Sequence, residues 1–174
     1  INNDGKITAD DRVRRTKNAE PRFVGGFNVN LRYKNFDLMA LFQGALGAET
    51  YIQTWSGTVG NYLKDFYDKR WTTENPNVEH PRAYERENQY WISNSNTYFI
   101  RSCDYLRLKN IELGYNITLP ALKNAGISNA RIYVNATNIF TIDKLKVADP
   151  EADDRNITSY PQRRVVNFGV SLTF

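Results

Sequence analysis

Five segments of the chain alternate apolar and polar residues with a period of two, which is the pattern of a β-strand with one apolar face. The clearest is the last, VVNFGVSLTF, where the apolar residues from Val166 to Phe174 alternate with Asn, Gly, Ser and Thr. Each segment has about the nine to eleven residues that a tilted strand needs to cross a bilayer. The other four segments lie at residues 23–33, 36–46, roughly 104–117 and 130–140.

The apolar phase changes inside the third of these segments. Leu106 and Leu108 share one face by strict alternation, whereas Ile111, Leu113 and Tyr115 fall on the opposite face. One extra residue in a strand produces this shift, so the pattern predicts either a β-bulge or a change of surroundings along the strand.

The connections between the five segments alternate between short and long. Two residues join the first pair, whereas more than fifty join the second, at residues 47–103. A connector at 118–129, with a helical turn at 120–124, is followed by a loop of about twenty residues at 141–162. Antiparallel strands would then have every short connection at one end, as in outer-membrane barrels with short periplasmic turns and long extracellular loops.

The sequence therefore predicts an all-β fold of antiparallel strands that belong to a transmembrane barrel. We expect residues 1–22, 47–103 and 141–162 to be extracellular and Phe174 to end at the periplasmic face. Five strands are too few to close a barrel, because the smallest have about eight. Further strands are expected upstream. On the polar face we expect the lumen to be lined by Asn28, Asn30, Arg32, Asp37 and Gln43.

Composition excludes several classes of site. Cys103 is the single cysteine and His80 the single histidine, so neither a disulfide, a zinc site nor a histidine-based triad is expected. The net charge of +4 comes from scattered basic residues, which does not favour nucleic-acid binding. Acidic residues are abundant in the loops, but nothing places two carboxylates across a cleft for glycoside hydrolysis. We predict that the chain is not an enzyme.

The first residues, INNDGKITADD, resemble a calcium-binding loop of the D-x-[DN]-x-[DN]-G type. With Gly5 as the sixth position, the candidate calcium ligands are Asn2, Asp4, the carbonyl of Lys6 and Asp11. The first ligand would precede Ile1, so we expect the chain to be part of a longer protein. The alternative is a plain turn, since Asn, Asp and Gly are favoured in turns.

The long loop at 47–103 contains most of the aromatic residues that precede the third strand. An amphipathic helix is predicted at 60–71. The aromatic side chains could form a small core for the loop, contact a partner protein, or bind a ligand directly. The candidates for ligand or partner contact are Trp55, Tyr62, Trp71, Tyr90 and Trp91.

Several motifs in collinear order carry a family resemblance that covers residues 4–174. They are DGKITADDR, YKNFDL followed by FQG, RWTTENPN, YLRLKNIELGY, IYVNATNIFTI and the terminal FGVSLTF. In this order the chain resembles the carboxy-terminal part of SusC/RagA-type outer-membrane proteins, which are TonB-dependent transporters of Bacteroidetes.

The resemblance implies a 22-stranded barrel of which residues 23–174 supply the last five strands, after an extracellular loop at 1–22. It implies import of oligosaccharides or peptides together with a SusD-like lipoprotein, driven through TonB by segments that precede Ile1. The calcium-like loop recurs in the family at this place, which favours a turn-stabilising role, and no cofactor other than Ca²⁺ is expected. The expected C-terminal assembly signal of the barrel is Phe168, Val170, Leu172 and Phe174.

Two rival interpretations come from other classes of protein. One is a secreted β-sandwich that binds calcium through the front loop and carbohydrate through the aromatic loop. The other is a fragment of a glycoside hydrolase. A second sheet packed on the apolar faces of the strands would favour the sandwich, whereas polar residues lining water opposite a lipid-facing apolar surface would favour the barrel.

Overall fold

A computed structural model describes the chain except for residues 1, 6–7, 17, 53–63, 83–96 and 153–158. The described chain divides into two compact units. Unit 1 comprises residues 1–21, 47–103 and 144–160, and unit 2 comprises residues 22–46, 104–143 and 161–174. Unit 2 begins at the predicted end of the first loop, although the predicted division into 1–22 and 23–174 stays a prediction.

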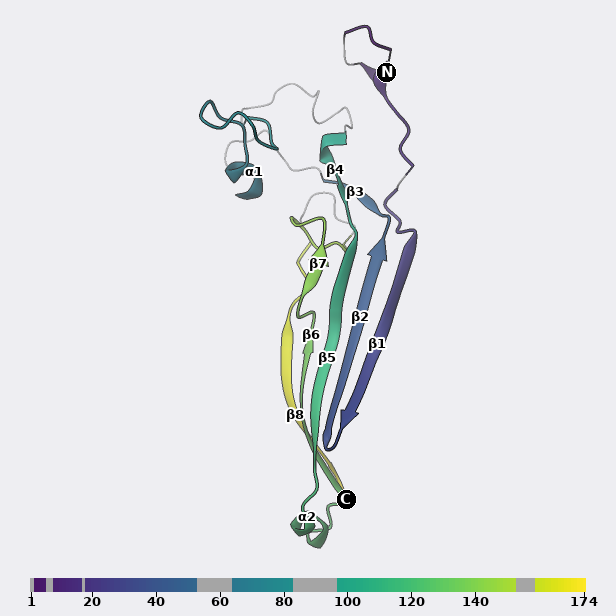
Figure 1. Cartoon of the computed structure of the whole chain (residues 1–174), viewed down its shortest axis with the longest axis vertical. Coiled ribbons are helices and arrows are strands. Elements are labelled where there is room, and N and C mark those ends of the chain that lie inside the picture. The colour runs from purple at the N-terminus through teal and green to yellow at the C-terminus, as the bar shows by residue number, and fades with distance from the viewer. Residues whose placement is uncertain (1, 6–7, 17, 53–63, 83–96, 153–158) are drawn as a thin grey trace. The chain divides into compact units, whose positions relative to one another are not determined.

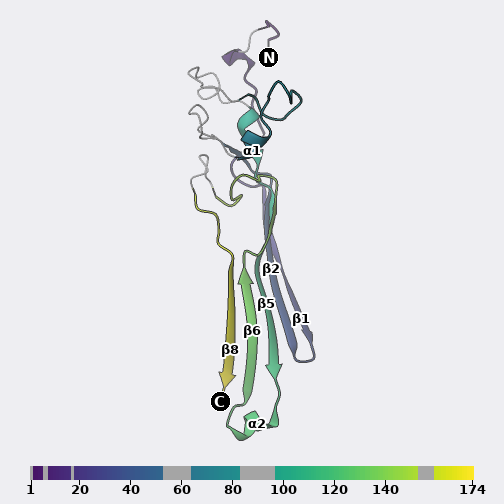
Figure 2. The same ribbon diagram turned by 90° about the vertical axis from the view of Figure 1, so that its left-hand side faces the viewer.

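Unit 2 is a single antiparallel sheet whose long strands follow the order β1-β2-β5-β6-β8 (Figures 1 and 2). The strands are β1 (Phe23–Tyr33), β2 (Phe36–Leu46), β5 (Tyr105–Ile117), β6 (Asn129–Thr137) and β8 (Val165–Thr173). The short strand β7 (Thr141–Asp143) also pairs with β5. The predicted all-β antiparallel fold is thus confirmed, while the count of 22 strands stays a prediction.

Both short connections and the C-terminus lie at the same end of this sheet (Figures 1 and 2). The β1–β2 turn places Lys34 at φ 53°, in the left-handed region. The β5–β6 connector contains helix α2 (Pro120–Asn124), which starts with proline, a residue suited to the first turn because it lacks an N–H. Gly126 then takes φ 76°, which ends the helix.

A β-bulge in β5 explains the shift of its apolar phase. Leu41 pairs with Asn110 and Phe42 pairs with Leu108, so Lys109 is the extra residue. The bulge brings Leu108 onto the same face as Ile111, and the apolar face of β5 is continuous. The bulge, one of the two explanations that the pattern left open, is therefore the correct one.

The fourth strand is shorter than predicted. It ends at Thr137, because Asn138 adopts φ 53° and leaves the extended conformation. Phe140 therefore does not continue β6, although its carbonyl accepts a hydrogen bond of 3.1 Å from the N–H of Leu108. The loop predicted at 141–162 begins with β7 instead.

Unit 1 consists of short elements. They are the 3-10 helices η1 (Ala9–Asp11) and η2 (Thr97–Phe99), the paired strands β3 (Glu49–Tyr51) and β4 (Ile100–Ser102), and helix α1 (Lys64–Asp68). The helix predicted at 60–71 is described only from residue 64, and there it ends at Asp68. Within the described ranges, no helix is both long and apolar enough to span a membrane.

A small apolar core joins both ends of the long loop at 47–103 to the segment that begins at residue 144. Ala48, Ile52, Cys103 and Leu145 form a buried cluster, with Val147 packed against it. The N–H of Cys103 also donates to the carbonyl of Ala48 at 3.0 Å. The base of the long loop therefore has its own core, as a loop of this length requires.

Candidate functional site

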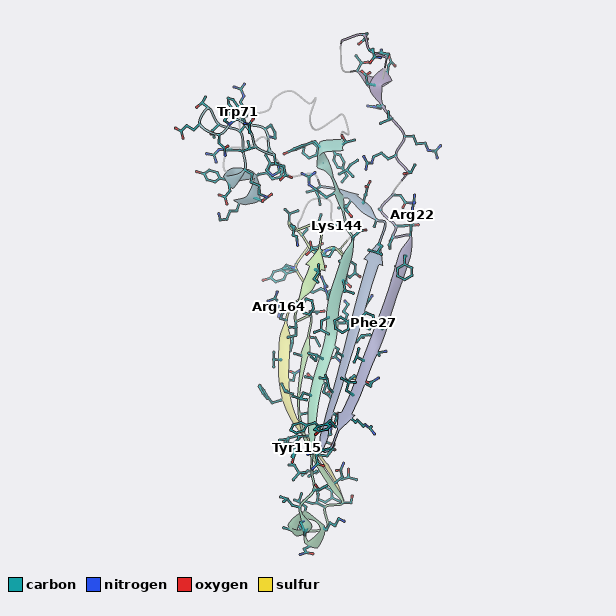
Figure 3. All side chains as sticks on the ribbon, viewed as in Figure 1. Arg22, Phe27, Trp71, Tyr115, Lys144 and Arg164 are labelled. Carbon is teal, nitrogen blue, oxygen red and sulfur yellow. The ribbon has the colours of Figure 1, made fainter. Side chains whose placement is uncertain are left out.

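The apolar residues of five adjacent strands share one face of the unit 2 sheet. Phe27 is paired with Phe42, and their rings stack with centroids 4.7 Å apart. Farther along the sheet, Val134 is paired with Phe168, whose side chain is 84% exposed. Figure 3 shows side chains projecting from these strands, with Phe27 and Tyr115 labelled. We call this surface the apolar face; its central members are Phe27, Val29, Leu31, Leu38, Ala40, Phe42, Leu108, Ile111, Leu113, Ile132, Val134, Ala136, Val166, Phe168, Val170 and Leu172.

The residues that alternate with these form a polar face on the other side of the sheet. The predicted lumen-facing residues belong to it by their register. Asn135 and Asn167 face each other across β6 and β8, and the amide of Asn167 donates a hydrogen bond of 2.9 Å to Asn135. Strands β6 and β8 are therefore joined by a side-chain hydrogen bond as well as by their backbone hydrogen bonds.

An ion-pair cluster connects three strands on the polar face. Arg131 on β6 donates from Nε to Asp37 Oδ1 on β2 at 3.1 Å and from Nη2 to Asp37 Oδ2. Nη2 also donates to Glu112 Oε1 on β5 at 2.8 Å. Asn116 adds a fourth bond, donating to Asp37 Oδ1 at 3.1 Å. The guanidinium thus satisfies a carboxylate in the bidentate geometry that suits it best.

Sequence reasoning placed Asp37 on this face but missed its partners. Arg131 and Glu112 occupy the polar phase of their own strands, so the alternation could have located them on the same face. Their meeting with Asp37 depends on the registers of two strand pairs, which the pattern of a single strand does not contain.

The front loop is closed by its own hydrogen bonds. Asp11 accepts from the backbone N–H of Thr8 at 2.8 Å and of Asn2 at 3.2 Å. The Asn2 side chain accepts from the N–H of Asp4 at 3.2 Å and donates to its carboxylate at 3.1 Å. Gly5 takes φ 76°, as the sharp turn requires. Three of the four predicted ligand residues are thus brought together, whereas Lys6 lies outside the described residues.

The carboxylate of Asp11 is stabilised in its charged form by the hydrogen bonds that it accepts within this loop. The backbone hydrogen bond from Thr8, followed by that from Asn2, lowers the pKa of Asp11. Among the residues that the structure describes, no group of three or more histidine, cysteine, aspartate or glutamate side chains is arranged to hold a metal ion. The loop oxygens instead serve the loop's own N–H groups.

His80 organises the described part of the long loop, which sequence reasoning did not anticipate. His80 is buried, with 3% of its surface exposed. Nδ1 lies 2.9 Å from the Tyr98 hydroxyl, and Nε2 lies 3.2 Å from Asp65 Oδ2. The imidazole stacks on Phe66 with a centroid distance of 4.1 Å. Backbone hydrogen bonds also join residue 80 to Lys69 and Trp71. We call His80, Asp65, Phe66 and Tyr98 the His80 cluster.

The charges around this cluster are paired. Lys69 Nζ lies 2.7 Å from Asp65 Oδ1. The hydrogen bond from Lys69, followed by that from His80, lowers the pKa of Asp65. A histidine in a proline-containing loop carried no sequence signal for this role, because its partners lie 15 and 18 residues away.

Trp71 is the one predicted contact residue of the long loop that falls in a described segment, where it is 38% exposed (Figure 3). Beside it in sequence, the guanidinium of Arg70 lies 3.9 Å from the centroid of the exposed Tyr67 ring. The other predicted contact residues lie outside the described residues; they are Trp55, Tyr62, Tyr90 and Trp91.

Comparisons with known proteins show that the chain is similar to TonB-dependent receptors. No family model matches it. It is 31% identical to TonB-dependent receptor P3 of Formosa agariphila over 100% of its length, and 30% identical to TonB-dependent receptor P26 of the same organism over 99%. It spans 18% and 19% of the length of these curated relatives.

Solved structures agree with the sequence relatives. The RagAB peptide importer in its closed-closed state gives a TM-score of 0.75 at 26% identity, and the RagAB peptide transporter gives 0.74 at 25%. Each match covers 97% of this chain and 19% of the solved chain. With its two-faced antiparallel sheet, the chain belongs to the SusC/RagA-type TonB-dependent receptors and corresponds to about a fifth of such a protein.

Proposed function

We propose that this chain forms part of the barrel wall of an outer-membrane importer that takes up nutrients with energy supplied through TonB. The apolar face would contact lipid, and the polar face would line the lumen. The long connections would then be extracellular, and Phe174 would lie at the periplasmic end. No catalytic step is assigned to the chain, since the named relatives are receptors and a peptide importer.

The observation that carries this proposal is the register of the sheet. Four successive strand pairings place apolar residues opposite apolar residues on one face, whereas the other face carries most of the polar residues of the strands together with Met39 and Leu41. Leu31 is 58% exposed and Phe168 is 84% exposed, although both are large and apolar. A barrel wall needs such an outward apolar band, whereas exposing the same band to water would destabilise a soluble sheet.

The partner and cargo follow from the relatives by analogy. The solved relative is described as a RagAB peptide importer, which supports peptides as one class of cargo. Oligosaccharides are the second class. We propose a SusD-like surface lipoprotein as the partner, with Trp71 among the long-loop residues that contact the partner or the cargo. The segments that contact TonB would belong to other parts of the full protein.

The front loop is proposed to be a structural turn that is closed by hydrogen bonds to Asp11 rather than by a metal ion. Both oxygens of Asp11 already accept backbone hydrogen bonds, and the oxygens of Asn2 and Asp4 bond within the loop. These bonds close the loop without a metal ion. We therefore propose that calcium is not required. A calcium titration that left the melting temperature of the full protein unchanged would agree.

The rival β-sandwich is less well supported. A sandwich buries the apolar face of one sheet under a second sheet about 10 Å away. Within unit 2, the described sheet is a single layer with its large apolar side chains exposed.

The full-length protein tests the proposal. It should fractionate with the outer membrane, require detergent for extraction, and migrate differently on a gel with and without boiling, as folded barrels do. A lipoprotein should co-purify with it. Solubility without detergent and the absence of a mobility shift would refute the proposal.

A labelling experiment tests the facing of the strands. In a cysteine-free background of the full protein, Asn167→Cys should react with a water-soluble maleimide, whereas the adjacent Phe168→Cys should react only with a lipid-soluble reagent. Equal reactivity of the two positions toward the water-soluble reagent would contradict the assignment of the two faces.

A further inference from the structure

The alternation of apolar and polar residues does not by itself fix how the strands are aligned. A slip of one residue moves every apolar side chain to the wrong face and is excluded. A slip of two residues preserves both faces, because the pleat repeats every two residues. The sheet therefore needs another determinant to select one alignment among those that differ by two.

Gly169 on β8 provides such a determinant. It is paired with Tyr133 on β6, and the phenol ring of Tyr133 lies over the space that a side chain at position 169 would occupy. A Cβ atom there would overlap the ring and lie 2.5 Å from its hydroxyl oxygen. Only glycine leaves that space open.

Gly114 on β5 is paired with Tyr133 as well, and the guanidinium of its diagonal neighbour Arg131 on β6 lies over it. A Cβ atom at position 114 would lie 2.5 Å from both Nε and Cζ of the guanidinium. Arg131 crosses the sheet over this glycine to reach Asp37 on β2. The guanidinium carbon also lies 5.1 Å from the centroid of the Tyr133 ring, so the two long side chains lie next to each other.

A slip of two residues would destroy both relationships. In β8 it would bring Asn167 or Ser171 beneath the Tyr133 ring, and the ring would have to leave its observed position to make room for either side chain. It would also separate Asn167 from Asn135, which are hydrogen-bonded in the observed alignment. In β5 it would bring Glu112 or Asn116 beneath Arg131, where again a side chain would replace open space.

We propose that Tyr133 over Gly169 and Arg131 over Gly114 select the alignment of β5, β6 and β8 and thereby set the stagger of this part of the barrel wall. The inference rests on the proposed function. In a closed barrel, the stagger between neighbouring strands sets their tilt. Tyr133 and Arg131 act as positioning residues, and neither is assigned to cargo binding.

Moving the glycine tests this role without changing composition. The variant Gly169→Ser with Ser171→Gly places the open space two residues farther along β8. Thr137→Cys with Val165→Cys reports the observed alignment, because these residues are paired. Thr137→Cys with Asn167→Cys reports the alignment slipped by two. We expect the swap to shift disulfide formation from the first reporter pair to the second, and Tyr133→Ala to remove this preference.

The outcomes separate this inference from the proposed function. If the unmodified full protein shows no heat-dependent mobility shift, the proposed function as part of a barrel wall is contradicted. A normal shift with unchanged crosslinking in the swap would overturn the alignment role. If the swap does not fold, Gly169→Ala should also lose most of the heat-shifted form and Gly169→Ala with Tyr133→Ala should recover it. No recovery would overturn the inference, with Ser171→Ala as the control for alanine in the same strand.

Discussion

Arg131 on β6 binds Asp37 on β2 through two hydrogen bonds, although strand β5 lies between them. Both side chains remain about three-quarters shielded, at 21% and 25% exposure. A contact that spans three strands depends on two alignments at once. It therefore couples the hairpin β1–β2 to the C-terminal strands on the polar face.

Removal of this pair should reveal that coupling. We expect Asp37→Asn and Arg131→Gln each to destabilise the barrel, and the double variant to be less damaging than the sum. Groups joined in one network typically show a coupling of about 0.5–3 kcal/mol in such a cycle. The free energy of unfolding of the refolded barrel in urea gives the measurement, with the exposed Glu20→Gln as the control. If the two losses in the free energy of unfolding were strictly additive, Asp37 and Arg131 would not be coupled.

The front loop should lose order in acid. Because the pKa of Asp11 is lowered in the folded loop, its stabilising effect is fully present above the unfolded value of about 3.9. That effect is lost as the pH falls through the lowered folded value. Hydrogen exchange at the Thr8 amide, compared between the natural chain and Asp11→Asn, should differ at neutral pH and converge in acid. Asp10→Asn should behave like the natural chain.

Strand positions were predictable from the sequence because each strand carries its own signal. The predicted bounds 23–33 and 36–46 match β1 and β2, and the bulge in β5 was one of the two explanations that the change of phase left open. The end of β6 was missed because Asn138 turns to φ 53° inside an apolar pattern that continues to Phe140. Backbone conformation at one asparagine leaves no trace in the alternation.

The contacts between distant residues were not predictable in the same way. Asp37 and Arg131 are 94 positions apart, and His80 meets partners on two other segments of the long loop. Such pairs follow from alignment and loop folding. A single sequence carries no direct record of either, and this is why the front loop was recognisable as a local motif whereas the His80 cluster was not.

Loss of His80 should loosen the long loop without removing the barrel. His80→Phe keeps the stack on Phe66 but removes the hydrogen bonds to Tyr98 and Asp65. A group left unsatisfied after such a loss costs about 1–3 kcal/mol. We expect protease added to intact cells to cut the segment 64–103 roughly 5- to 160-fold faster, in proportion to local opening.

The matched control for this experiment is Lys64→Ala. It removes an exposed ion pair with Asp68 on the same helix. Solvent screens such exposed pairs and they contribute little to stability, so cleavage should change little. Equal acceleration by both variants would mean that His80 has no special role in the loop.

Two adjacent residues of β8 allow the strongest test of the two-faced sheet. Phe168 belongs to the apolar face and is 84% exposed, whereas Asn167 belongs to the polar face and bonds to Asn135. In a bilayer, Phe168→Arg should cost up to roughly 2–4 kcal/mol, the range for a basic residue at the midplane of a barrel's lipid face. Asn167→Arg places the same charge one residue away in water and should cost much less. Levels of the folded, heat-shifted protein in the outer membrane measure both. A larger loss for Asn167→Arg than for Phe168→Arg would reverse the assignment of the faces, because the two positions are adjacent on β8 and lie on opposite sides of the sheet.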